Sequence, residues 1–222
     1  MIFLSNINMS KLINKKKFLK DLKNFKKLSY KKKERVFKLA WETKNFEIDL
    51  YWKRAGYFWA FQAIVLAGLF AVASSDELEF EKPYYLHYTV CLGFITGLGW
   101  FLINKGSKVW QRHWEKVIDV LEDYVIGKLY KTNTSQITFS VSKINELISQ
   151  FFMLLWLLLL IKSNFFDNSL IQYSNNCLNI DWKLLIPDII VIYISYQMYF
   201  GKGRGRFGER KIQFYRRKIN IN

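Results

Sequence analysis

The chain has 222 residues, 51% of them hydrophobic, and an excess of Lys and Arg that produces a formal net charge of +16. The large apolar fraction excludes an intrinsically disordered chain, and two cysteines are too few for a disulfide scaffold. Apolar and charged residues are segregated along the chain, which is atypical of a soluble enzyme. We therefore expect an all-α, multi-pass membrane protein with amphipathic helices outside the bilayer.

Residues 1–37 form a lysine-rich arm in which Phe18, Leu22 and Phe25 recur at helical spacing. A basic amphipathic helix of this kind adsorbs to anionic lipid, so anionic lipids are the predicted partner of the arm. A merely solvated basic arm is the plainer alternative. Nucleic-acid binding is a third reading, but no base-reading module accompanies the charge, and we expect no nucleic-acid partner.

Residues 38–131 are predicted to form a two-span core. The windows 55–75 and 83–104 contain no Asp, Glu, Lys or Arg, and each is long enough as a helix to cross a hydrocarbon core of about 30 Å. The segment 38–56 is predicted to be a helix that continues into the first span. Aromatic and basic residues at its end are the predicted membrane-interface anchors: Trp52, Lys53, Arg54 and Trp59.

A cytoplasmic helix is predicted over residues 105–127, with a bend at Gly106-Ser107 where the chain leaves the bilayer. Its apolar stripe consists of residues at spacings of one helical turn: Trp110, Trp114, Val117 and Leu121. The stripe needs a partner, which is the 38–54 helix, a neighbouring subunit or the membrane surface.

Small residues are spaced for close helix packing within or between subunits. The ridge in the first span is made of alanines at intervals of four, Ala63, Ala67 and Ala71. The second span contains Gly93 and Gly97 in a GxxxG pattern. Together they predict tight packing of the first two spans against each other.

The remainder of the chain is predicted to contain a polar linker (132–146), a second pair of spans (147–166 and 184–200) and a basic cytoplasmic tail (201–222) that contacts anionic lipid. The charge-free part of the third span is short, so whether it is full length stays open. Lys and Arg are concentrated before the first span, between the second and third, and after the fourth. This alternation predicts four spans in the inner membrane, with both termini cytoplasmic.

Few residues are candidates for chemistry. Asp188 is the one acid inside an apolar window and is a candidate intramembrane polar site for a proton or cation path, although its place near the membrane boundary favours a structural role. His87 and His113 are expected on opposite sides of the membrane, and no Cys/His spacing suggests zinc. We expect no cofactor, no metal and no enzymatic activity.

Two long segments resemble a known family. The chain resembles the RipA-type octameric membrane protein family of bacteria (8xMP) in these two segments, FEIDLYWKRAGYFWAFQAIVLAGLFAV (46–72) and WFLINKGSKVWQRHWEKVIDVLEDYVIGKLYKT (100–132). The similarity covers roughly residues 38–132. It implies a homo-octamer in the inner membrane, and no catalytic residue can be carried over. The lysine-rich arm and the second pair of spans depart from a minimal two-span member.

The leading functional hypothesis is a non-enzymatic homo-oligomer with a scaffolding or envelope-associated role, whose helices 38–56 and 104–127 form a cytoplasmic collar. The alternative is an oligomeric channel or pore-forming membrane effector, for example in phage defence. A symmetric ring and Asp188 favour that alternative. The absence of a polar stripe in the first two spans, beyond Gln62, Thr89 and Thr96, argues against it.

Overall fold

The computed structural model describes residues 15–22, 24–76, 80–132, 139–167, 171–174, 177–201 and 203. Its helices are α1 (Lys15–Asp21), α2 (Tyr30–Ser74), α3 (Lys82–Leu121), α4 (Val141–Lys162) and α5 (Trp182–Tyr199). Short 3-10 segments, η1 (Phe25–Lys27) and η2 (Glu122–Tyr124), follow α1 and α3, and α4 continues into the π-helical segment η3 (Ser163–Asp167). Residues 1–14 and nearly all of the predicted tail (201–222) lie outside the described residues.

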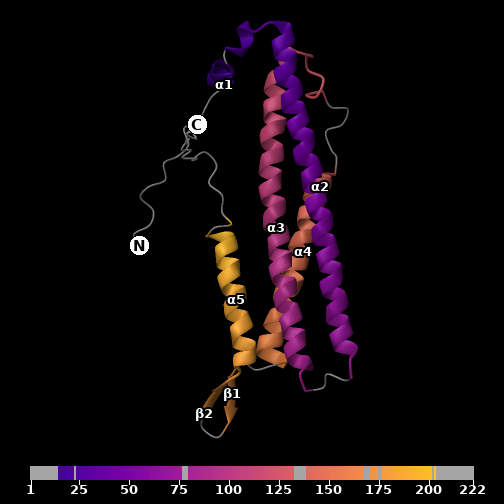
Figure 1. Cartoon of the computed structure of the whole chain (residues 1–222), viewed down its shortest axis with the longest axis vertical. Coiled ribbons are helices and arrows are strands. Elements are labelled where there is room, and N and C mark those ends of the chain that lie inside the picture. Colours follow the sequence, from indigo (N-terminus) through magenta and orange to yellow (C-terminus); the bar gives the residue numbers. More distant parts are fainter. Residues whose placement is uncertain are drawn as a thin grey trace, which may run out of the picture.

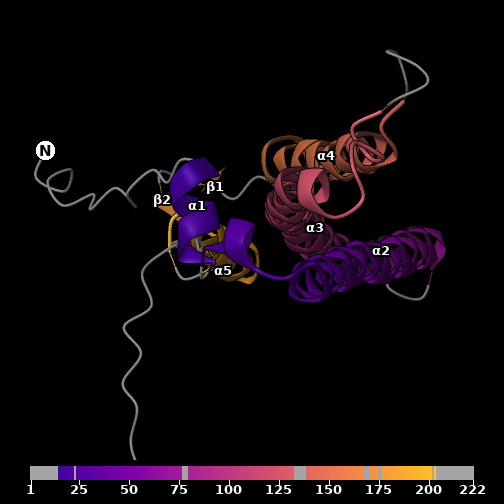
Figure 2. The same ribbon diagram turned by 90° about the horizontal axis from the view of Figure 1, so that it is seen from above.

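The central helix of the bundle is α3, and α2, α4 and α5 each pack against it (Figure 1, Figure 2). Since α2 has 45 residues and α3 has 40, they are about 67 and 60 Å long, roughly twice the thickness of a hydrocarbon core. Their charged halves, 30–54 and 105–121, therefore extend beyond lipid, while α4 and α5 lie beside the apolar half (Figure 1). The predicted continuity of 38–56 with the first span is confirmed. By contrast, α3 passes through Gly106 and Ser107 as one helix.

Within the described residues, three helices are long and apolar enough to cross a membrane, namely those that begin at Tyr30, Lys82 and Val141. The expectation of membrane-spanning helices is confirmed for these three, but the predicted count of four is wrong on this measure. The reason lies in α5, which has only 18 residues and carries Lys183 and Asp188 in its first half. Its uninterrupted apolar stretch is consequently shorter than a bilayer.

The boundaries in the second half of the chain also differ from the sequence prediction. Because α4 begins at Val141, residues 141–146 are helical rather than part of the linker, and linker residues 133–138 lie outside the described residues. The 22 residues of α4 make a helix about 33 Å long. The third apolar window is therefore long enough to cross a bilayer.

A short β-hairpin joins η3 to α5. Strands β1 (Ile171–Ser174) and β2 (Cys177–Ile180) are antiparallel, with Ile171 opposite Ile180. The hairpin lies beyond the ends of α4 and α5 (Figure 1). The other described elements are helices, which confirms the predicted all-α class for the bundle, and isoleucine and tyrosine favour extended backbone in this one short segment.

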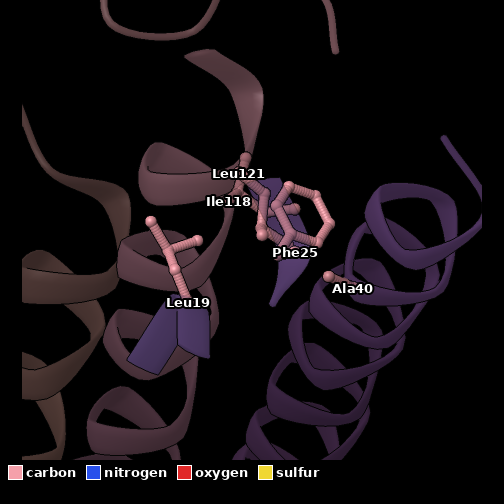
Figure 3. Close-up of a cluster of buried hydrophobic side chains, with 5 residues drawn as sticks. All are labelled: Leu19, Phe25, Ala40, Ile118 and Leu121. Carbon is pink, nitrogen blue, oxygen red and sulfur yellow. The ribbon is translucent and has the colours of Figure 1, made fainter. Parts of the chain in front are cut away.

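The N-terminal segment packs on the charged end of the α2–α3 pair. The buried members of this cluster are Leu19, Phe25, Ala40, Ile118 and Leu121 (Figure 3). Phe18 and Leu22 pack against it. The apolar stripe of the arm therefore packs in protein, about 20 Å along α2 from Arg54, and the predicted contact of the basic arm with anionic lipid stays a prediction.

Candidate functional site

The two glycines of the GxxxG pattern bring α3 into direct contact with α4. A Cβ at Gly93 would overlap the indole ring of Trp156, and a Cβ at Gly97 would lie 3.2 Å from the Cα of Met153. Both positions are buried. The two glycines therefore face α4, whereas the sequence predicted that they face the first span; α2 also packs against α3, as predicted.

The predicted alanine ridge of α2 does not form the contact with α3. Ala63, Ala67 and Ala71 are exposed on the surface of the chain. The α2 residues that turn inward in this part of the helix are Gln62 and Val65. Val65 packs with Val90 and Trp156 in a small apolar cluster. The three alanines therefore form an outward-facing surface of small side chains.

Buried polar side chains connect the three helices inside the apolar half. The Nε2 atom of Gln62 donates to Thr96 Oγ1 at 3.0 Å, and its Oε1 atom accepts from Trp156 Nε1 at 2.5 Å. In lipid a polar group finds no water, so each must be satisfied within the protein. These bonds specify which faces of α2, α3 and α4 meet.

A second polar group lies where the helices leave the apolar half. Asn145 Nδ2 donates to Tyr51 Oη at 2.8 Å and to Asn104 Oδ1 at 3.3 Å. The guanidinium of Arg54 donates to Oγ of the buried Ser107 at 3.0 Å. Arg54 is thus tied to α3 in addition to its predicted place at the membrane interface.

The other predicted interface and packing residues are divided between interior and surface. Trp52 and Trp59 are exposed, and the ring of Trp59 contacts those of Trp100 and Phe152. Lys53 is exposed. On the α3 stripe, Leu121 is buried and Trp114 and Val117 pack beside it against the N-terminal cluster. Trp110 is 40% exposed and lines an open groove of about 470 Å³ together with residues of α2 and α5.

Asp188 lies against α3 in a compact group of polar side chains. Its Oδ1 atom is 3.4 Å from His87 Nε2, and Cys91 Sγ is 3.5 Å from the same nitrogen. On the other side of the ring, His87 Nδ1 is 3.0 Å from Ser163 Oγ. His87 is fully buried, Cys91 is 6% exposed and Asp188 is 9% exposed.

This arrangement differs from a nucleophile–histidine–carboxylate relay. In a relay the imidazole uses one nitrogen for the nucleophile and the other for the carboxylate. Here the thiol and the carboxylate both face Nε2, while Nδ1 is engaged by a serine of η3. The group therefore brings a nitrogen, a sulfur and an oxygen close together.

The sequence prediction missed two members of this group. His87 and Cys91 are four residues apart on α3 and therefore share a face of the helix, a signal that was available in the sequence. The sequence analysis placed His87 and His113 on opposite sides of the membrane and did not pair His87 with Cys91. Asp188 was singled out, but nothing in the sequence placed α5 against the start of α3.

A comparison with protein families decides the membership of the chain. Residues 34–166 match the model described as the octameric membrane protein family (8xMP). The chain belongs to this family. No curated protein and no solved structure matches it.

The 8xMP region begins in the first turns of α2, includes α3 and α4, and ends within η3. The predicted departure from a two-span family member is thus wrong for the third apolar helix, which is part of the family core. The hairpin and α5 lie outside the matched region. Asp188 therefore reaches the 8xMP core from a segment that the family model does not cover.

The 8xMP core carries an outward apolar stripe along residues 39–64, more than half the length of α2. Its members are more than half exposed and recur at intervals of 7, 11 and 7 residues: Leu39, Phe46, Tyr57 and Ile64. Both intervals bring a helix back to within about 20° of the same face. The stripe runs from the apolar half of α2 past Arg54 into the charged half, where lipid cannot cover it.

Proposed function

We propose that this protein is a non-enzymatic scaffold of the bacterial inner membrane, a homo-octamer with an envelope-associated role. One observation carries the proposal: Leu39 and Phe46 are 65% and 59% exposed on the half of α2 that is rich in charged residues. Lipid covers apolar side chains in the other half of the helix, but these two would face water in a single subunit. Contact with a neighbouring subunit would cover both side chains.

The energetics favour such a contact. Covering a Leu or Phe side chain contributes about 1.5–3 kcal/mol, and a closed ring repeats the contribution at every subunit boundary. The exposed alanines of α2 fit the same interpretation, since small side chains let a second helix approach closely within lipid. The predicted collar then consists of the charged halves of α2 and α3, reinforced by the N-terminal cluster.

Charge supports an orientation with this collar in the cytoplasm. The charged half of α2 and the segment before it are rich in Lys, and cytoplasmic segments of membrane proteins carry such an excess. The end of α5 lines the same groove as Gly106 and Trp110, so the chain that follows α5 begins on the side of the collar. Both termini are then cytoplasmic, and the hairpin faces the outside.

The channel alternative receives no support from the polar residues of the spans. Thr89 and Thr96 donate to carbonyls of their own helix, at 2.8 Å in each case. Gln62 is buried and bonded to Thr96 and Trp156. Gln62 faces the interior of one subunit, and the two half-buried threonine hydroxyls are satisfied by their own helix, whereas a pore between subunits needs a line of polar groups on the outer surface.

Native mass measurement of the detergent-solubilised protein tests the scaffold proposal. Wild type is expected as one discrete oligomer, and Leu39→Glu with Phe46→Glu is expected to shift the population to smaller species. The matched control is Asn45→Glu, which adds a charge at an exposed position beside the stripe and is expected to leave the subunit number unchanged. A monomeric wild type, or a double variant with the wild-type subunit number, contradicts the assignment of the stripe.

Conductance of proteoliposomes separates the two functional classes. A scaffold gives no current above that of empty vesicles at any voltage or salt concentration. Reproducible unitary currents from the intact oligomer would favour the channel instead.

A further inference from the structure

The buried group around His87 combines three chemically different ligand atoms from two helices. His87 and Cys91 are one turn apart on α3, and Asp188 comes from the first half of α5. The ligand atoms of all three residues lie within 4.8 Å of one another. His87 lies about 8 Å along α3 from its start at Lys82, so the group is close to the end of the bundle where the hairpin lies.

The distances from His87 Nε2 match those of a tetrahedral metal centre. Around Zn²⁺, with bonds of about 2.3 Å to sulfur and about 2.0–2.1 Å to nitrogen and oxygen, the N and S ligands are about 3.5 Å apart and the N and O ligands about 3.3 Å apart. The corresponding distances here are 3.5 Å to Cys91 Sγ and 3.4 Å to Asp188 Oδ1. Both ligands face the nitrogen that a metal would use.

Two neighbouring side chains hydrogen-bond to these ligands, as residues behind the ligands do at metal sites. The hydroxyl of Ser163 lies 3.0 Å from His87 Nδ1, so that nitrogen can carry the proton and leave Nε2 with its lone pair. Asn164 Nδ2 donates to Asp188 Oδ1 at 3.3 Å. The second carboxylate oxygen, Oδ2, is buried and accepts no hydrogen bond from any residue that the structure describes.

Charge balance points to a divalent ion. A thiolate and a carboxylate supply two negative charges, and a neutral imidazole adds none, so a divalent cation makes the group electrically neutral. Neutrality matters here because an uncompensated charge in a buried, low-dielectric place is costly. A mixed N, S and O donor set suits zinc and related transition metals, whereas Mg²⁺ and Ca²⁺ prefer oxygen ligands alone.

We propose that His87, Cys91 and Asp188 bind a zinc-like divalent transition metal that fastens α5 to α3. Three protein ligands leave a fourth position, which a water molecule can fill. The ion links the hairpin and α5 to the family core. The competing explanation is an ordinary buried pair of protonated His87 and ionised Asp188, with the Cys91 thiol as an apolar neighbour.

Titration of the reduced, full-length protein with Co²⁺ in detergent, after removal of metals with a chelator, distinguishes the two explanations. Cobalt bound tetrahedrally through a thiolate shows a charge-transfer band in the near ultraviolet and intense visible bands. We expect both in wild type, saturating at one equivalent per chain and displaced by Zn²⁺ but not by Mg²⁺. A wild-type protein without these bands overturns the proposal and leaves the ion-pair explanation.

Variants then assign the ligands, with circular dichroism and gel filtration to verify folding. Cys91→Ser is expected to abolish the thiolate band, while Cys177→Ser is expected to keep it. Asp188→Asn is expected to weaken binding, and so is Ser163→Ala, the latter by about 10–100-fold as for other outer-shell partners. His113→Gln on the same helix serves as the matched control with wild-type affinity. A band that depends on Cys177 overturns the proposal.

The wild-type protein also provides a test that needs no variant. Zn²⁺ bound only to the folded chain raises the midpoint of thermal unfolding by mass action. We expect such a rise with Zn²⁺ and none with equal Mg²⁺. Identical unfolding midpoints with both ions contradict the site.

Discussion

The indole N–H of Trp156 on α4 donates a hydrogen bond to the side-chain carbonyl of Gln62 on α2. The indole ring lies against Gly93 of α3, and the amide of Gln62 donates to Thr96 of the same helix. Both Trp156 and Gln62 are almost fully buried. One amide and one indole therefore connect three apolar helices at a single level of the bundle.

Replacing Gln62 by Leu is expected to lower the free energy of unfolding by about 1–3 kcal/mol, since the buried N–H of Trp156 loses its acceptor. Trp156→Phe removes the orphaned donor, so the double variant is expected to lose less than the sum of the two single variants. Denaturation in mixed micelles, followed by circular dichroism, measures each value. Strict additivity would mean that the two side chains do not interact.

Replacing Gly93 by Ala is expected to destabilise the α3–α4 contact by about 1–3 kcal/mol, because the new methyl group overlaps the ring of Trp156. Gly68→Ala is the matched control, since a Cβ there meets nothing within 4 Å. The control is expected to be neutral or slightly stabilising, because alanine is the better helix former. Thermal unfolding of both variants in the same detergent provides the comparison. Equal midpoints for the two variants would contradict the packing at Gly93.

Replacing Phe25 by Ala is expected to detach the N-terminal segment from the collar. Phe25 is fully buried between α2 and α3, and removal of such a side chain costs about 3–5 kcal/mol. Limited proteolysis should cut the segment before Tyr30 faster, and amides near Ile118 should exchange with solvent faster. Phe139→Ala serves as the control because Phe139 is 93% exposed. Unchanged cleavage in Phe25→Ala would contradict the cluster of Figure 3.

Lys131 forms ion pairs within the turn that follows α3. Its contribution to the free energy of unfolding is expected to depend on pH. Its Nζ atom is 2.6 Å from Asp123 Oδ1 and 3.4 Å from the buried Oε1 of Glu122. The hydrogen bond to Asp123 raises the pKa of Lys131 above its ordinary value. Because the folded-state pKa is the higher one, the contribution is complete below the ordinary lysine pKa and disappears as the pH rises through the raised value.

Lys131→Met should therefore unfold more easily than wild type near neutral pH, by less than about 1 kcal/mol for a solvated pair. The difference from wild type should vanish in strongly alkaline buffer, where the wild-type amine is also neutral. Lys128→Met on the same turn provides the control for the loss of one positive charge. A difference that persists unchanged at high pH would rule out the ion pair as its cause.

Much of the helical framework could be predicted from the sequence, because each feature depends on neighbouring residues. Charge-free windows around Ala55–Ser75 and Pro83–Asn104 place helices in lipid, and the absence of a breaker before Arg54 extends α2 into water. The hairpin and the early start of α4 at Val141 were not predicted, since polar, uncharged residues are compatible with loop, strand and helix alike.

By itself, the sequence determined the apolar helices, the charged ends that lie outside lipid and the family to which the chain belongs. Only the tertiary structure decided that Gly93 faces α4, that the alanines of α2 face outward, that Phe25 is buried in the collar and that Asp188 meets His87 and Cys91. Helical periodicity determines which residues share a face. It does not determine which helix that face will meet, because such a contact depends on how segments far apart in the chain pack together.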